Sequence, residues 1–195
     1  MSNRTTVGRA AAIATAVLFA VLRATSAGAE PTAATTAPDF TLSDQNGHAF
    51  RLSQQRGRPV VLFFGYTHCP DVCPTILANL RRARAEIGPK ASTAVVALIT
   101  VDPERDTAAE LGSYVSAFDP SFLGLRGDPR ELAAVYRAYH VRFHRESEGP
   151  RDYLISHTAF VYYIGRNGRI RALGLWDDAQ PFLKRSLEEI TGSKP

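Results

Sequence analysis

Cysteine, methionine and tryptophan are scarce in this sequence. The 195 residues include two cysteines, one methionine and one tryptophan. So few cysteines exclude a disulfide-dense scaffold. The longest uncharged run that is apolar apart from one Thr has 13 residues, at positions 10–22, which excludes a polytopic membrane protein because a spanning helix needs about 20. Internal repeats are also lacking. A hydrophobic content of 45% with 22% charged residues is typical of one globular domain.

Acidic residues are missing from the amino terminus. Arg4 and Arg9 precede the apolar run, Arg23 ends it, and the small residues of Ala27-Gly28-Ala29 follow, with the first acid at position 30. This order predicts a secretory signal over residues 1–29, or an uncleaved anchor as the alternative. No cysteine lies near the cleavage site, which excludes a lipoprotein anchor. We therefore expect a periplasmic or exported protein, soluble or tethered to the inner membrane by this segment.

The basic charge lies largely in the same segment. Residues 1–29 contain three arginines and no acid, so their removal lowers the formal net charge from +4 to +1. The remaining basic residues are scattered and form no stripe interleaved with aromatic side chains. The sequence therefore predicts no nucleic-acid partner. It predicts membrane contact only through an uncleaved anchor.

Residues 30–38 are small, polar and bracketed by proline, and we interpret them as a flexible tether. Beyond them, strand and helix patterns alternate. Continuous apolar runs predict buried strands at 59–65 and 93–101. Asn167-Gly168 predicts a hairpin, and Asp106 is expected to cap a helix. The order indicates an α/β, thioredoxin-like mixed sheet flanked by helices over residues 39–195, with an N-terminal extension at 40–52. Further helices are expected at 75–87, 107–118, 129–139 and 180–190, and further strands at 122–125, 159–164 and 169–175.

Both cysteines lie in one short segment, GYTHCPDVCPT at 65–75, between a predicted strand and a predicted helix. A disulfide between Cys69 and Cys73 would close a small ring and constrain the unfolded chain little. On a helical turn their Cβ atoms would lie about 6 Å apart, and the amino end of a helix lowers thiol pKa values. The pair is suited to disulfide exchange, to binding a soft metal, or to both.

One histidine is placed to complete a metal site. His157 immediately precedes the predicted strand 159–164, in the loop that faces the cysteine loop in a thioredoxin-like sheet. Two thiolates and an imidazole suit Cu(I) or, with a weak fourth ligand, Cu(II); zinc accepts the same donors, but its structural sites have four ligands. Cys-x-x-x-Cys spacing and the lack of proline in Ser156-His157-Thr158 favour metal binding over general disulfide exchange. The other histidines are interpreted as solvated or surface residues (His48, His140, His144) or as a neighbour of the site (His68).

Three segments resemble the SCO/SenC family of copper chaperones for cytochrome c oxidase assembly. They are GYTHCPDVCPT at 65–75, TVDPERDT at 100–107 and YLISHTAFVYYI at 153–164, the last followed by Asn-Gly-Arg. The resemblance extends from Pro38 onward and implies a thioredoxin-like fold with an inserted hairpin at 141–153. It implies that Cys69, Cys73 and His157 bind one Cu(I) or Cu(II) per chain. The sequence departs from the family at Ser156, where Asp is common. Candidate outer-shell residues are His68, Asp71 and Asp102.

The same resemblance implies a function in copper transfer. Such a protein would be a metallochaperone that delivers copper to the dinuclear copper site of cytochrome c oxidase subunit II. It would bind and transfer its cargo rather than turn over a substrate, and its partners would be that subunit and other periplasmic copper carriers. The alternative is a thiol–disulfide oxidoreductase in which Cys69 and Cys73 reduce the cysteines of that site before the metal is added.

Overall fold

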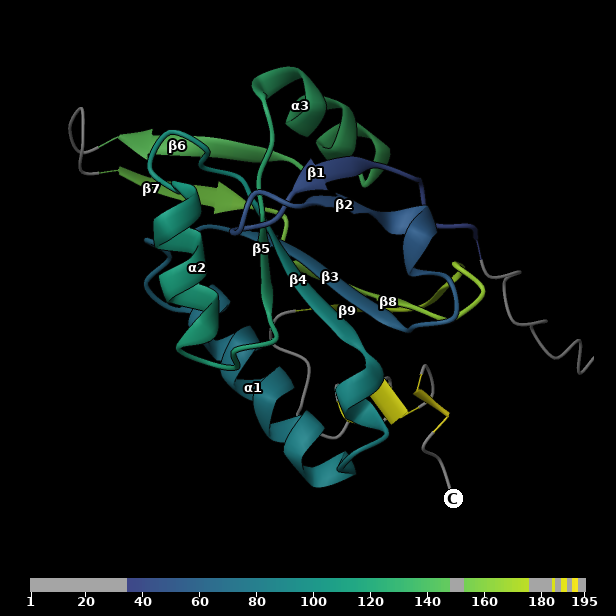
Figure 1. Ribbon diagram of the computed structural model, residues 1–195. Helices are drawn as coiled ribbons and strands as arrows, with labels where there is room; N and C mark the ends of the chain where they lie inside the picture. Colours follow the sequence, from purple (N-terminus) through teal and green to yellow (C-terminus); the bar gives the residue numbers. More distant parts are fainter. Residues whose placement is uncertain (1–34, 148–152, 176–183, 185–186, 189–190, 193–195) are drawn as a thin grey trace, which may run out of the picture. The chain divides into compact units, whose positions relative to one another are not determined.

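A five-stranded mixed sheet lies at the centre of the molecule (Figure 1). The computed structural model describes residues 35–147, 153–175, 184, 187–188 and 191–192. The strand order is β5-β4-β3-β8-β9. β3, β4 and β5 are parallel to one another, whereas β8 runs antiparallel to β3 and to β9. The strands are β3 (Val60–Gly65), β4 (Val95–Thr100), β5 (Leu123–Leu125), β8 (Phe160–Ile164) and β9 (Ile170–Leu175).

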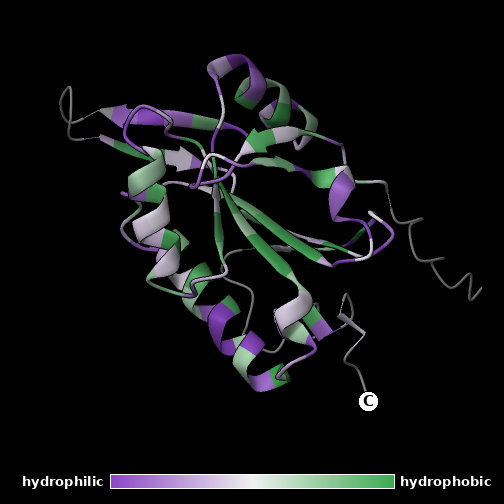
Figure 2. Ribbon diagram, viewed as in Figure 1, coloured by the Kyte–Doolittle hydropathy of each residue, from purple (hydrophilic) through white to green (hydrophobic). Residues whose placement is uncertain are grey.

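The two central strands are buried along their whole length, as their continuous apolar sequences predict. Because β3 and β4 are parallel, a crossover must join them, and α1 (Val72–Ile87) supplies it. Ile76, Leu77 and Leu80 of α1 are fully buried against the sheet, while the outer face of the helix is hydrophilic (Figure 2). The predicted strands and the thioredoxin-like arrangement are confirmed, with boundaries that differ by one to two residues.

Each face of the sheet carries its own hydrophobic core. On one face α1 and α2 (Ala108–Ser116) pack through residues such as Leu80 and Leu111. On the other face lie α3 (Pro129–Ala138), the N-terminal extension and the inserted hairpin. Tyr139 is central to this second core: its ring meets Phe40, Phe64 and Tyr162 at centroid distances of 5.2–5.9 Å.

The expected N-terminal extension forms a small antiparallel hairpin followed by a 3₁₀ turn. It comprises β1 (Thr41–Ser43), β2 (Ala49–Arg51) and η1 (Leu52–Gln55), and a second 3₁₀ turn, η2 (Ala91–Thr93), precedes β4. Leu42 and Phe50 are buried beneath α3. The Tyr139 hydroxyl donates to the Pro38 carbonyl at 2.8 Å, which attaches the start of the described chain to the domain.

The inserted hairpin is longer than expected and differs in position. β6 (Phe143–Ser147) pairs antiparallel with β7 (Tyr153–His157), so the hairpin reaches position 157 rather than ending at 153. Two further predictions need correction. α1 begins at Val72, three residues before the expected start. Thr107, not Asp106, is the N-cap of α2, where its side chain accepts from the Glu110 amide in a capping box.

Several predictions fall on residues outside the described part of the chain. These are the signal at 1–29, most of the tether at 30–38 and most of the helix expected at 180–190. Within the ranges that the structure does describe, no helix has the length and apolarity needed to cross a bilayer.

Candidate metal centre

The two cysteines lie where β3 passes into α1. Cys73 occupies the first turn of α1 and is completely buried, whereas Cys69 in the preceding loop is partly exposed. The Cys73 amide donates to the Cys69 sulfur at 3.4 Å. A Cβ at Gly65 would lie only 2.5 Å from the Cys73 sulfur. Glycine at position 65 therefore leaves the space that the buried sulfur occupies.

His157 approaches the sulfurs from the end of β7, not from a loop as the sequence indicated. Its Nε2 lies 4.0 Å from the Cys73 sulfur, and the ligand atoms of Cys69, Cys73 and His157 all lie within 4.8 Å of one another. Its Nδ1 lies 3.1 Å from the Thr158 carbonyl oxygen. Because a carbonyl only accepts, Nδ1 carries the proton and Nε2 presents a lone pair to the sulfurs.

Tyr66 connects the cysteine loop to β7. Its ring meets the His157 ring edge to face at 5.9 Å, and its hydroxyl accepts from the Ile155 amide at 3.1 Å. The Tyr66 carbonyl also accepts from the Cys69 amide at 3.3 Å. One buried side chain thus fixes the strand that carries the imidazole relative to the loop that carries a thiol.

The two thiols are electrostatically unequal. The hydrogen bond from Cys73 lowers the pKa of Cys69 to about 4, with the backbone amides of Cys73 and Asp71 acting in the same direction against the opposing effect of burial. The hydrogen bond with Cys69 and burial raise the pKa of Cys73. In the metal-free reduced protein Cys69 is therefore the thiolate, and Cys73 holds the proton that the pair shares.

Asp106 is a supporting residue whose role the sequence analysis missed. Its buried carboxylate accepts from the Thr67 and Thr100 hydroxyls, each at 2.6 Å, and from the Thr67 amide at 3.2 Å. Burial raises the pKa of Asp106. The contact joins the end of β4 to the loop that leads to Cys69. An acid just after a buried strand, in TVDPERDT, was the available signal, and we interpreted it as a helix cap.

The predicted outer-shell residues do not converge on the sulfurs. His68 is exposed and bonds the Thr67 hydroxyl at 3.0 Å. Asp71 is exposed and acts on Cys69 through its backbone amide. Asp102 is buried and pairs with Arg105. Its carboxylate accepts a hydrogen bond from the Tyr153 hydroxyl at 2.8 Å and so holds the first residue of β7 in place. Ser156 faces solvent on β7.

The remaining histidines are solvent-exposed, as expected. His140 and His48 are exposed, and His144 lies beside Glu146 at 3.3 Å with a side chain that is 70% exposed. Among the residues that the structure describes, the only group of metal-binding side chains consists of Cys69, Cys73 and His157. Cys69 and His157 line a shallow hollow of about 280 Å³ that opens to solvent between the cysteine loop and β7, and Cys73 is buried next to it. Two sulfurs and one imidazole can hold a soft metal ion there.

Fold and site define a thioredoxin-like domain with a solvent-accessible Cys–Cys–His cluster. The SCO1/SenC family model matches residues 28–191, and the chain belongs to this family. It is 38% identical over 161 residues to the mitochondrial SCO2 homologue of Bos taurus, a match covering 80% of this chain and 57% of that protein. It is 34% identical over 134 residues to an SCO2-like protein of Rickettsia conorii, a match covering 67% of this chain and 65% of that protein. The chain thus spans less than two thirds of either relative.

Solved structures agree with this assignment. ScoI of Bradyrhizobium japonicum, solved with copper bound, superposes with a TM-score of 0.70 at 38% identity, covering 80% of this chain and 99% of that one. ScoI of Arabidopsis thaliana, also solved with copper bound, gives a TM-score of 0.74 at 29% identity, covering 82% and 100%.

We predict that Cys69 is alkylated before Cys73 in the metal-free reduced chain. Because its thiolate persists in acid, its rate with iodoacetamide should change by less than about twofold between about pH 5 and pH 7, whereas an ordinary thiol accelerates about tenfold per pH unit. Peptide mapping by mass spectrometry measures both rates. The variant Cys73→Ala lacks the proton donor, so its Cys69 alkylation rate should again depend steeply on pH. Faster labelling of Cys73 in the unmodified chain would contradict the assignment.

Asp106→Asn should destabilise the metal-free protein by about 1–3 kcal/mol, because an amide cannot accept all the hydrogen bonds that the buried carboxylate accepts. Urea denaturation measures the change. Glu86→Gln, which removes an exposed carboxylate that is 46% accessible and paired with Lys184, is the matched control and should cost less than about 1 kcal/mol. Equal effects of the two substitutions would refute a supporting role for Asp106.

Proposed function

We propose that this chain is an exported copper-binding protein that holds one copper ion through Cys69, Cys73 and His157. The observation that carries the proposal is the convergence of these three ligand atoms within 4.8 Å. Copper is the cargo here, and its presence in two solved relatives of the same fold supports the choice of metal. Two thiolates favour Cu(I), and the neutral imidazole nitrogen extends the site to Cu(II).

The exposure of the site suits transfer rather than storage. Cys69 and His157 are partly accessible at an open hollow, while Cys73 is buried beneath them. An acceptor can therefore replace the outer ligands one at a time while Cys73 still holds the ion. We infer that the acceptor is the dinuclear copper site of cytochrome c oxidase subunit II, since family membership points to oxidase assembly. Other periplasmic copper carriers would supply the ion.

His157→Ala should abolish stable Cu(II) binding while Cu(I) binding through the two thiolates persists. Titration of the reduced full chain should give one copper per chain. We expect the Cu(II) affinity of the variant to fall by at least about a hundredfold, more than loss of an outer-shell partner costs. Competition with a chromophoric chelator measures Cu(I), and the thiolate-to-copper absorption band measures Cu(II).

His144→Ala is the control for this substitution, because it removes an imidazole from the exposed face of the same hairpin. It should leave both affinities unchanged. If the two variants behave alike, His157 is not a ligand and the proposed site is wrong.

A second candidate function is reduction of disulfides, which the lowered pKa of Cys69 favours. The Cys69 thiolate would attack a target disulfide, form a mixed disulfide and release one target thiolate. Cys73, losing its proton, would then attack the Cys69 sulfur and release the second. The chain ends as a disulfide and the target gains two electrons.

Oxidase assembly in cells separates the two functions. Because Cu(II) binding requires all three ligands, a protein that delivers Cu(II) should fail to support assembly as His157→Ala and as either cysteine variant. A reductase requires only the cysteines. Full assembly with His157→Ala, combined with failure of Cys69→Ala and Cys73→Ala, would establish reduction in place of Cu(II) delivery.

A further inference from the structure

Four arginines gather at the end of the sheet away from the cysteines. Arg56 and Arg58 lie in the turn between η1 and β3, and Arg166 and Arg169 lie in the turn between β8 and β9. Neither turn contains an acidic residue. β3 separates this arginine platform from the cysteine loop by its six residues, or about 20 Å.

Hydrogen bonds join the two turns to each other. The Gly57 amide donates to the Arg166 carbonyl at 2.9 Å, and the Arg166 guanidinium donates back to the Gly57 carbonyl at 2.7 Å. The Arg56 guanidinium also donates to the Asn167 carbonyl. Hydrogen bonds across more than a hundred residues of sequence thus hold the positive charges at one edge.

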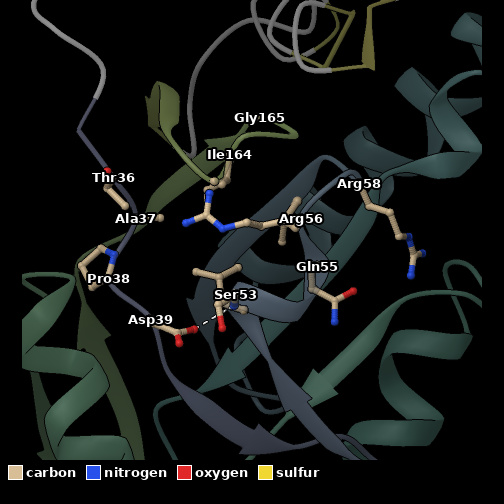
Figure 3. Close-up of a pocket in the computed structure, with 13 residues that line it drawn as sticks. Thr36, Ala37, Pro38, Asp39, Ser53, Gln55, Arg56, Arg58, Ile164 and Gly165 are labelled. Atoms are coloured by element: carbon tan, nitrogen blue, oxygen red, sulfur yellow. Dashed lines mark hydrogen bonds between the residues drawn. The ribbon is translucent and has the colours of Figure 1, made fainter.

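The guanidinium groups of Arg56 and Arg58 do not converge on one small ligand. Arg56 extends across a pocket of about 380 Å³ towards Ala37, while Arg58 extends away on the other side of the turn (Figure 3). Asp39, the acid that lines this pocket, already accepts hydrogen bonds from the Arg51 guanidinium at 3.1 Å and from the Ser53 amide at 2.8 Å. Charges spread along a projecting edge fit an extended array of phosphates better than a single phosphate ion.

The described chain also begins at this platform. The Ile170 amide donates to the Thr35 carbonyl at 2.8 Å, and the Ala37 amide donates to the Gly168 carbonyl at 3.0 Å. In the sequence, only residues 23–34 separate Thr35 from the apolar run at 10–22. Twelve residues reach at most about 40 Å, so a bilayer that holds the apolar run keeps the platform within reach of its surface.

We propose that the arginine platform docks on anionic phospholipid headgroups. Each arginine close to an anionic surface strengthens binding about fivefold, and salt weakens the attraction. Docking by this edge leaves the opposite end, with Cys69 and His157, directed away from the bilayer. The proposal is independent of what the cysteines bind.

Arginine labelling of the full chain tests the proposal. The 195-residue chain is reconstituted in vesicles of phosphatidylcholine, with or without about one third phosphatidylglycerol, and treated from outside with p-hydroxyphenylglyoxal. Peptide mass spectrometry then gives the rate at each arginine. We expect labelling of the platform arginines to be at least about fivefold slower on anionic vesicles, and the protection to be lost in high salt. The exposed Arg130 and Arg142 are internal controls whose rates should not change.

A pair of variants provides the matched comparison. Arg58→Gln with Arg169→Gln removes two platform charges outside the hydrogen bonds that join the turns, and protection of Arg56 and Arg166 should disappear. Arg130→Gln with Arg142→Gln removes the same charge elsewhere and should leave protection intact. Equal labelling on both vesicle types would overturn the proposal. So would protection on neutral vesicles by added inorganic phosphate, which would indicate a small-anion site.

Discussion

The junction between β3 and α1 is the constraint on which the rest of the site depends. Cys73 can be fully buried in the first turn of α1 only because residue 65 has no side chain. The hydrogen bond with Cys69 and burial both raise the pKa of Cys73, and the proton that Cys73 retains stabilises the Cys69 thiolate. A single packing requirement therefore produces one buried anchor and one reactive, partly exposed anion. The inequality of the thiols follows chiefly from the hydrogen bond between them and from the deeper burial of Cys73.

The imidazole is brought to the sulfurs by a separate, longer-range set of contacts. β7 belongs to an inserted hairpin rather than to the central sheet, so its position depends on buried polar contacts. Tyr66 holds it at Ile155, and Asp102 holds it through Tyr153. These hydrogen bonds are strong because they are buried. Asp102, a candidate outer-shell acid, thus acts on the strand that carries His157, at a distance from the metal-binding atoms.

The central sheet could be predicted from the sequence because each of its signals is local. Continuous apolar runs marked β3 and β4, and Asn167-Gly168 marked a hairpin whose glycine indeed has a φ of +75°. The cysteine pair was equally local. By contrast, the true partners of Asp106 lie 6 and 39 residues away, and the pairing of β6 with β7 is not encoded in a short turn motif. Long-range contacts of this kind have no signature in composition or periodicity, which is why Asp106 was assigned to a cap and His157 to a loop.

The two ends of the central sheet carry different chemical groups. The carboxyl ends of the parallel strands β3 and β4, and with them the Cys69 thiolate, lie at one end of the sheet, where β7 brings the imidazole to the sulfurs. The described chain begins at the other end, where the two arginine-bearing turns are joined by the Gly57 amide donating to the Arg166 carbonyl and the Arg166 guanidinium donating to the Gly57 carbonyl. If the arginine platform docks on a bilayer as we propose, the soft-ligand site lies at the far end of the sheet and stays accessible to an incoming protein. The direction of β3 and β4, fixed by the crossover through α1, therefore places the cysteine loop at the end of the sheet opposite the arginine turns.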